Sequence, residues 1–79
     1  ELIMEIIKGQ RYVHFKGHVI TVLEIAKHTE TGEMMVVYLH EGTNVVWARP
    51  YEMFISKVDR TKYPDVEQEY RFQLMDDNK

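Results

Sequence analysis

The stretch that decides the fold runs from residue 12 to residue 28 and reads YVHFKGHVITVLEIAKH. It is rich in β-branched and aromatic residues, and Gly17 interrupts it, which is typical of two strands joined by a tight turn. A two-residue turn at Lys16 and Gly17 would fix the register and create one apolar face. That face would hold Val13, Phe15, Ile20 and Val22. The stretch therefore predicts a β-hairpin.

The same composition continues in residues 33–40 and 45–49, so the hairpin extends into a β-meander. Glu30 and Thr31 suit the centre of a type I turn, with Gly32 as the left-handed residue that follows. A four-residue loop over residues 41–44 then pairs Trp47 with Tyr38. The apolar face predicted for this part of the sheet holds Leu23, Ile25, Met35, Val37, Leu39, Val46 and Ala48.

The two hairpins disagree about which side of the second strand points inward. Ile20 and Val22 are even-numbered, whereas Leu23 and Ile25 are odd-numbered, and a regular strand cannot bury both sets on one face. A β-bulge near Val22 and Leu23 would resolve the conflict and bend the strand. We therefore predict a mainly β fold, a small and strongly bent barrel.

The C-terminal third predicts one short helical turn and a last strand. Pro50 suits the first turn of a helix, so residues 50–54 are expected to be helical, with Met53 and Phe54 plugging the barrel end. Residues 55–59 would form a core strand and residues 60–66 a surface loop. Apolar residues alternate with polar ones over residues 70–74, which is typical of a half-buried strand. We expect a single domain over residues 1–79, with its core in about 9–75 and a polar tail in 76–79.

Composition and charge narrow the class of protein. The chain has 79 residues, no cysteine and a net charge of −3, with 10 Lys and Arg against 13 Asp and Glu. The absence of cysteine excludes a disulfide framework and favours a cytoplasmic setting. No apolar run approaches the length of a membrane span, so we expect no membrane partner. The evenly mixed charge makes nucleic acid an unlikely partner, although a small local patch would still be compatible.

Four blocks of sequence resemble a known family. They are Tyr12 to Gly17 (YVHFKG), Ala26 to Thr31 (AKHTET), Val36 to Tyr38 (VVY) and Trp47 to Phe54 (WARPYEMF). In this order they resemble the signature of the small bacterial family known as domain of unknown function 1653. The resemblance implies an SH3-type β-roll and implies no activity. The loop between Tyr38 and Trp47 is shorter than this family suggests, and Ala48 stands where a larger apolar residue is common.

The face opposite the predicted core gathers side chains that stack, donate hydrogen bonds and pair charges. Exposed aromatic residues beside an arginine are typical anchors of binding surfaces. We therefore predict a noncatalytic binding module for a peptide, a modified side chain or a small molecule. Its binding residues would be Tyr12, His14, Glu24, His28, Tyr38, Trp47 and Arg49. In a purely structural alternative, Trp47 and Tyr38 pack beneath the C-terminal strand and Arg49 pairs with Glu24 or Glu30.

Metal, enzyme and RNA hypotheses have weaker support. His14 and His18 flank the Gly17 turn and would point to opposite faces, so we predict no metal site and no cofactor. A small hydrolase or acid-base enzyme would need His14 or His28 beside Glu24 or Glu30. An RNA-associated accessory domain would stack bases on Trp47 and Tyr38. Whether the protein is an enzyme is left open, as is its oligomeric state.

Overall fold

The computed structural model describes residues 5–75 and consists of five strands and one short helix. The elements are β1 (Arg11–His14), β2 (Val19–Lys27), β3 (Met34–His40), β4 (Val45–Pro50), α1 (Tyr51–Phe54) and β5 (Phe72–Leu74). The polar tail predicted for residues 76–79 lies outside the described residues. The predicted mainly β fold with one short helical turn is confirmed.

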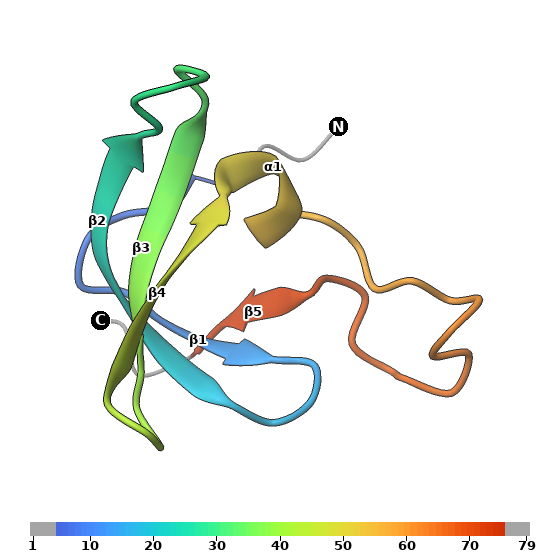
Figure 1. The fold of residues 1–79 in the computed structure, drawn as a ribbon. Helices are drawn as coiled ribbons and strands as arrows, with labels where there is room; N and C mark the ends of the chain where they lie inside the picture. The colour runs from blue at the N-terminus through green and yellow to red at the C-terminus, as the bar shows by residue number, and fades with distance from the viewer. Residues whose placement is uncertain (1–4, 76–79) are drawn as a thin grey trace.

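All five strands form one antiparallel sheet in the order β4-β3-β2-β1-β5 (Figure 1). The last strand returns to pair with the first, so β5 lies beside β1. The strands β4 and β5 are the two edges, and the sheet is open where a closed barrel was one of the predicted forms. Between α1 and β5 the chain extends away from the sheet as a long loop (Figure 1).

The predicted bulge in the second strand is confirmed. Val22 pairs with Tyr38 and Glu24 pairs with Val37, so Leu23 is the extra residue of β2. The extra residue shifts the alternation by one, and side chains before and after it reach the same face. Ile20 and Val22 are buried there, and Ile25 packs against the same core.

The predicted register of the first hairpin is wrong by one residue. The backbone N–H of His14 donates to the carbonyl oxygen of His18 at 2.7 Å, so Phe15, Lys16 and Gly17 form a three-residue loop. Gly17 has a φ of +96°, the left-handed conformation that such a loop requires. A slip of one residue reverses every side chain of β1. Tyr12 is therefore buried, whereas Val13 and Phe15, which we expected in the core, are only partly covered.

The second hairpin departs from the prediction in the same way. Lys27 pairs with Met34 and Ile25 with Val36, because the loop has four residues, 29–32, where three were expected. The predicted pairing of Tyr38 with Trp47 is confirmed. Together these registers bury Val36 and Tyr38. They also turn five residues that we predicted for the core to the opposite side: Met35, Val37, Leu39, Val46 and Ala48.

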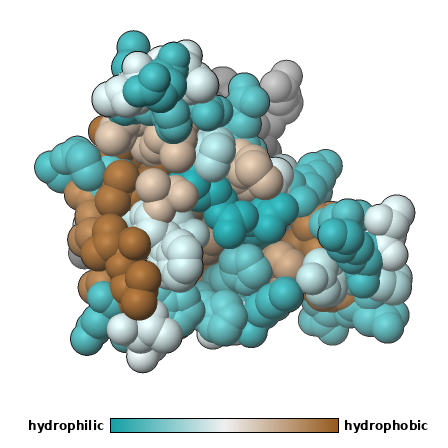
Figure 2. All heavy atoms as spheres, in the orientation of Figure 1, coloured by the Kyte–Doolittle hydropathy of each residue, from teal (hydrophilic) through white to brown (hydrophobic). Residues whose placement is uncertain are grey.

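The faces of β1, β3 and β4 are therefore the reverse of the prediction, whereas Ile20, Val22 and Ile25 of β2 face the core as predicted. We call the face that buries Tyr12, Val36 and Tyr38 the inner face. The outer face carries the five apolar residues just named, and Val46 is 54% exposed. Leu23, also predicted for the core, is 39% exposed. In Figure 2 apolar atoms gather along the side of the molecule where β2, β3 and β4 lie.

The C-terminal third covers the inner face and completes the core. The rings of Phe54 and Phe72 stack with centroids 4.1 Å apart, and the ring of Tyr38 lies 5.7 Å from that of Phe72. Phe54 is therefore buried in the core, as predicted, whereas Met53, which was also expected there, is 49% exposed. The strand expected over residues 55–59 is reduced to one bridge, Lys57 with Tyr70, although Val58 is buried.

Candidate binding pocket

A pocket of about 280 Å³ opens on the inner face, at the end of the sheet where β1 turns into β2. Residues from every strand reach it, because the pairings His14 with Phe72, Ile20 with His40 and Tyr38 with Trp47 align across the sheet. We call it the cationic pocket. Its lining residues are His14, His18, Ile20, Tyr38, His40, Trp47, Arg49 and Phe72.

Three histidines form a row along one wall of this pocket. The ring centroids of His14 and His18 are 5.9 Å apart, and those of His18 and His40 are 4.9 Å apart. The prediction that His14 and His18 point to opposite faces is wrong, because the three-residue loop sets them directly across from each other. The His14 ring also stacks on Phe15 at 4.4 Å and meets the edge of Phe72 at 5.0 Å.

Trp47 and Arg49 form the rim of the pocket on β4. We predicted them on the face away from the core, but they pair with Tyr38 and Val36 and so lie on the inner face. The indole of Trp47 remains 54% exposed, so the C-terminal strand does not enclose it. The guanidinium of Arg49 lies 5.7 Å from the centroid of the Phe72 ring, a cation–π contact that holds it over the pocket.

The pocket has a positive electrostatic character. The pKa of His14 is lowered to about 4, first because the ring is partly buried and then because the charges of Arg49 and Arg71 oppose its protonation. Arg71 is fixed nearby by a hydrogen bond from its Nε to the hydroxyl of Ser56 at 3.2 Å. Among residues 5–75, no acidic side chain lines this pocket or forms an ion pair with Arg49.

The structure brings together four of the seven predicted binding residues: His14, Tyr38, Trp47 and Arg49. Tyr12 lies on the same face but is buried in the core, where its hydroxyl donates to Gln10 at 2.9 Å. Glu24 lies on the outer side and pairs with Lys8 at 3.0 Å, so it is not the partner of Arg49.

His28 also lies away from the pocket. It precedes the loop between β2 and β3, and its Nδ1 accepts the backbone N–H of Glu30 at 3.1 Å. Sequence analysis missed His18 and His40. The signal that could have found them is Gly17, since two residues followed by a left-handed glycine is also typical of a three-residue hairpin loop.

This arrangement limits what chemistry the pocket can perform. In the part of the chain that the structure describes, no group of three or more His, Cys, Asp or Glu side chains has a geometry that would hold a metal ion. The acid-base pair considered for an enzyme was His14 or His28 with Glu24 or Glu30, and of these four residues only His14 lines the pocket. Glu24 is engaged with Lys8 on the outer side, and the Glu30 carboxylate accepts a hydrogen bond from the hydroxyl of Thr29 in the loop after His28. An arginine, three imidazoles and an indole around an apolar floor can hold an anion and pack against a flat group.

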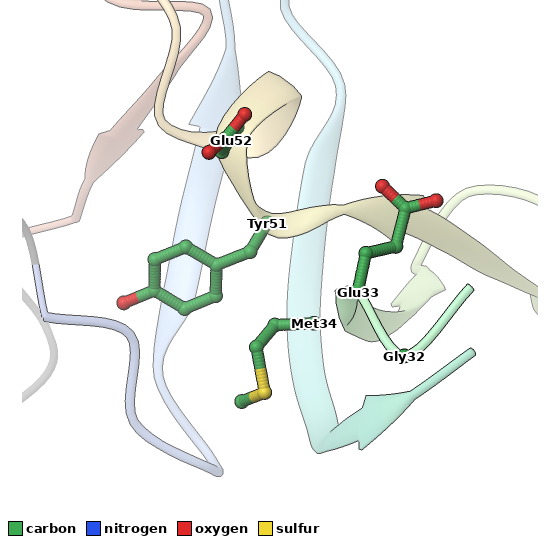
Figure 3. Close-up of a pocket in the computed structure, with 5 residues that line it drawn as sticks. All are labelled: Gly32, Glu33, Met34, Tyr51 and Glu52. Atoms are coloured by element: carbon green, nitrogen blue, oxygen red, sulfur yellow. The ribbon is translucent and has the colours of Figure 1, made fainter. Parts of the chain in front are cut away.

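A second hollow, of about 550 Å³, lies near the opposite end of β3. It is lined by Gly32, Glu33, Met34, Tyr51 and Glu52, and we call it the acidic hollow. The carboxylates of Glu33 and Glu52 lie on one side of it, and the Met34 side chain and the Tyr51 ring lie on the other (Figure 3). No sequence prediction singled out this group of residues.

Fold and pocket together define a small, open, five-stranded β domain with a cationic and aromatic pocket on its inner face. The chain belongs to the family described as Protein of unknown function (DUF1653), whose model matches residues 10–74. The resemblance inferred from the four sequence blocks is thereby confirmed. No curated protein and no solved structure matches the chain. Within residues 5–75, the only helix is α1, which is far too short to cross a bilayer.

Proposed function

We propose that this domain is a noncatalytic binding module that holds an anionic group of a peptide or small molecule in the cationic pocket. The observation that carries the proposal is the position of Arg49, held over the Phe72 ring at 5.7 Å beside the exposed indole of Trp47. The absence of cysteine supports a cytoplasmic setting.

The charges around the pocket favour a carboxylate or phosphate as the bound group. Arg49 has no acidic partner among the described residues, so an incoming anion does not have to displace a carboxylate of this chain from it. A hydrogen bond between charged partners contributes about 1.5 to 3 kcal/mol when it is shielded from solvent. Trp47 adds a large apolar contact area at low entropic cost, which suits a flat or aliphatic group beside the anion.

The test uses Trp47, the single tryptophan of the chain, as a fluorescence reporter. N-acetylglutamate amide, a small model for an acidic side chain, is titrated at pH 6. About 0.3 kcal/mol for each of its heavy atoms predicts a Kd on the order of 1 mM. Arg49→Gln is expected to weaken binding at least tenfold, whereas the charge-matched control Lys27→Gln changes it less than twofold.

Two results would contradict the proposal. Equal loss of binding in Arg49→Gln and Lys27→Gln would indicate nonspecific attraction of the anion to positive charges and no specific pocket. A single-stranded oligouridylate that binds with a steep salt dependence and quenches Trp47 more strongly than the glutamate compound would favour the RNA-associated alternative.

A further inference from the structure

The strand β4 is an edge whose protection is confined to its C-terminal end. It pairs with β3 alone, so half of its backbone N–H and C=O groups face away from the sheet. Its first four residues are exposed and carry no charge, and only Arg49 and Pro50 follow them. Natural edge strands are commonly blocked by charges, prolines or short length. The other edge, β5, has only three residues, whereas β4 has six.

This edge adjoins both the cationic pocket and the apolar outer face. Trp47 and Arg49 point to the pocket, and Val46 and Ala48 point to the other side. Side chains of an added strand would alternate in the same way, one set above the pocket and the other beside Val46 and Ala48. The apolar surface of β3 and β4 would then continue onto the added strand (Figure 2).

We propose that β4 receives an extended segment of another protein, in which acidic residues alternate with apolar ones, as a sixth strand of the sheet. The inference rests on the proposed function, because the acidic side chains of the segment would occupy the cationic pocket. Backbone hydrogen bonds to β4 would provide affinity, and the alternation of side chains would provide specificity.

Charge favours a foreign acidic segment over a second copy of this chain. Residues 45–50 contain no acidic residue, so the β4 strand of another copy has nothing to place in the pocket. Antiparallel pairing of two β4 strands would also bring two cationic pockets close together, and like charges across neighbouring strands are destabilising. A segment with glutamate or aspartate at alternate positions complements the charge of Arg49, and the imidazole N–H groups that line the pocket can donate hydrogen bonds to its carboxylates.

The probe is a blocked seven-residue peptide in which valine alternates with glutamate, titrated against the protein by Trp47 fluorescence. We expect binding at least tenfold tighter than that of N-acetylglutamate amide, because strand pairing adds to the anion contact. A peptide with lysine in place of glutamate should bind at least tenfold more weakly than the glutamate peptide.

Backbone N-methylation distinguishes strand pairing from other modes of binding. In an extended strand, the N–H groups of the glutamates face one edge and those of the valines face the other. Methylating one of these two sets should weaken binding at least tenfold, and methylating the other set should change it less than twofold. Equal effects of the two modifications would overturn the inference.

The remaining outcomes separate this inference from the proposed function. If the glutamate compound binds and the peptide binds no better, the edge proposal fails and the anion pocket stands. If neither binds, both fail. A concentration-dependent dimer in sedimentation velocity that the peptide does not dissociate would identify a second copy as the occupant of β4 and would also overturn the inference.

Discussion

The cationic pocket and the acidic hollow lie near opposite ends of β3 and have opposite charge. The pocket takes His40 from the end of β3 and Arg49 from β4, whereas the hollow takes Met34 from the start of β3 and Glu52 from the helix that follows β4. A chain whose charges are mixed along the sequence thus separates them in space. A near-neutral net charge therefore says little about local binding surfaces.

The two sites also differ in their relation to the core. The floor of the cationic pocket includes Phe72, which is 1% exposed and stacks on Phe54. The acidic hollow is lined by Met34, which is 43% exposed. A pocket built on a packed floor holds its rim residues in fixed positions, as binding sites require. We therefore expect substitutions at the two sites to differ strongly in their effect on stability.

The largest expected effect is on the free energy of unfolding. Phe72→Ala removes a buried ring and should cost about 3 to 5 kcal/mol, whereas Met34→Ala should cost less than about 1 kcal/mol. Urea denaturation followed by circular dichroism measures both. If Phe72→Ala does not fold, Phe72→Leu provides the comparison. Equal costs for Phe72→Leu and Met34→Ala would show that the pocket floor is not part of the core.

Trp47→Ala should separate binding from stability. Because the indole is 54% exposed, its removal should lower the free energy of unfolding by less than about 1 kcal/mol. Binding of N-acetylglutamate amide, measured by calorimetry since the reporter is lost, should weaken about tenfold. The matched change in the acidic hollow, Glu52→Gln, should leave binding within twofold. A Trp47→Ala protein that is unfolded at room temperature would contradict the claim that Trp47 lies exposed on the rim of the cationic pocket.

Acid should destabilise the protein through His14 before it acts through the carboxylates. The folded-state pKa of His14 is lowered to about 4, so the unfolded chain binds the proton more readily and stability falls as pH decreases from about 6.5 to 4. After allowance for solvent screening of this partly exposed ring, the loss is on the order of 1 kcal/mol. The lowered pKa values of Glu41 and Asp59 act only below about pH 4.5, where those carboxylates become protonated.

The measurement for this prediction is the melting temperature between pH 7 and pH 5. Because pH 5 lies between the two pKa values of His14, about half of this loss, on the order of 0.5 kcal/mol, falls within the measured range. It corresponds to a decrease of roughly 2 to 4 °C in a domain of this size. His14→Gln should remove most of that decrease, and the control His28→Gln, outside the pocket, should retain it. Identical pH profiles for the wild type and His14→Gln would contradict the assigned cause.

The smallest expected effect is that of a chelator. Three histidines line the cationic pocket, but among the described residues no three His, Cys, Asp or Glu side chains are arranged to hold a metal ion. EDTA should therefore change the melting temperature by less than about 1 °C. Elemental analysis of the purified protein provides the check. Stoichiometric zinc, with unfolding on its removal, would contradict this prediction.

The sequence predicted those features that depend on local pattern. The bulge at Leu23 follows from a conflict of parity within one strand, and the pairing of Tyr38 with Trp47 follows from one loop of the right length. The grouping of His14, Tyr38, Trp47 and Arg49 on one face was also correct. These relations need only alternation and short-range turn geometry.

What the sequence did not predict is which face is covered. Two loops, 15–17 and 29–32, each have one residue more than expected. Each extra residue turns the side chains of a neighbouring strand to the opposite face of the sheet. Both faces of β3 are apolar enough to be buried, so composition could not decide between Val36 and Val37. The inner face is covered because Phe54 and Phe72, which are remote from it in sequence, pack against Tyr38. Contacts between such distant residues cannot be predicted from the local sequence pattern of a strand.

The most direct test of the account is an NMR titration of the ¹⁵N-labelled protein with N-acetylglutamate amide at pH 6. We predict saturable chemical-shift changes at the Trp47 indole N–H and the Arg49 backbone amide, with no change at Gly32, Glu33, Met34 and Glu52 in the acidic hollow. Shifts confined to the acidic hollow, or no saturable shift at Trp47 and Arg49, would contradict the claim that the cationic pocket is the binding site.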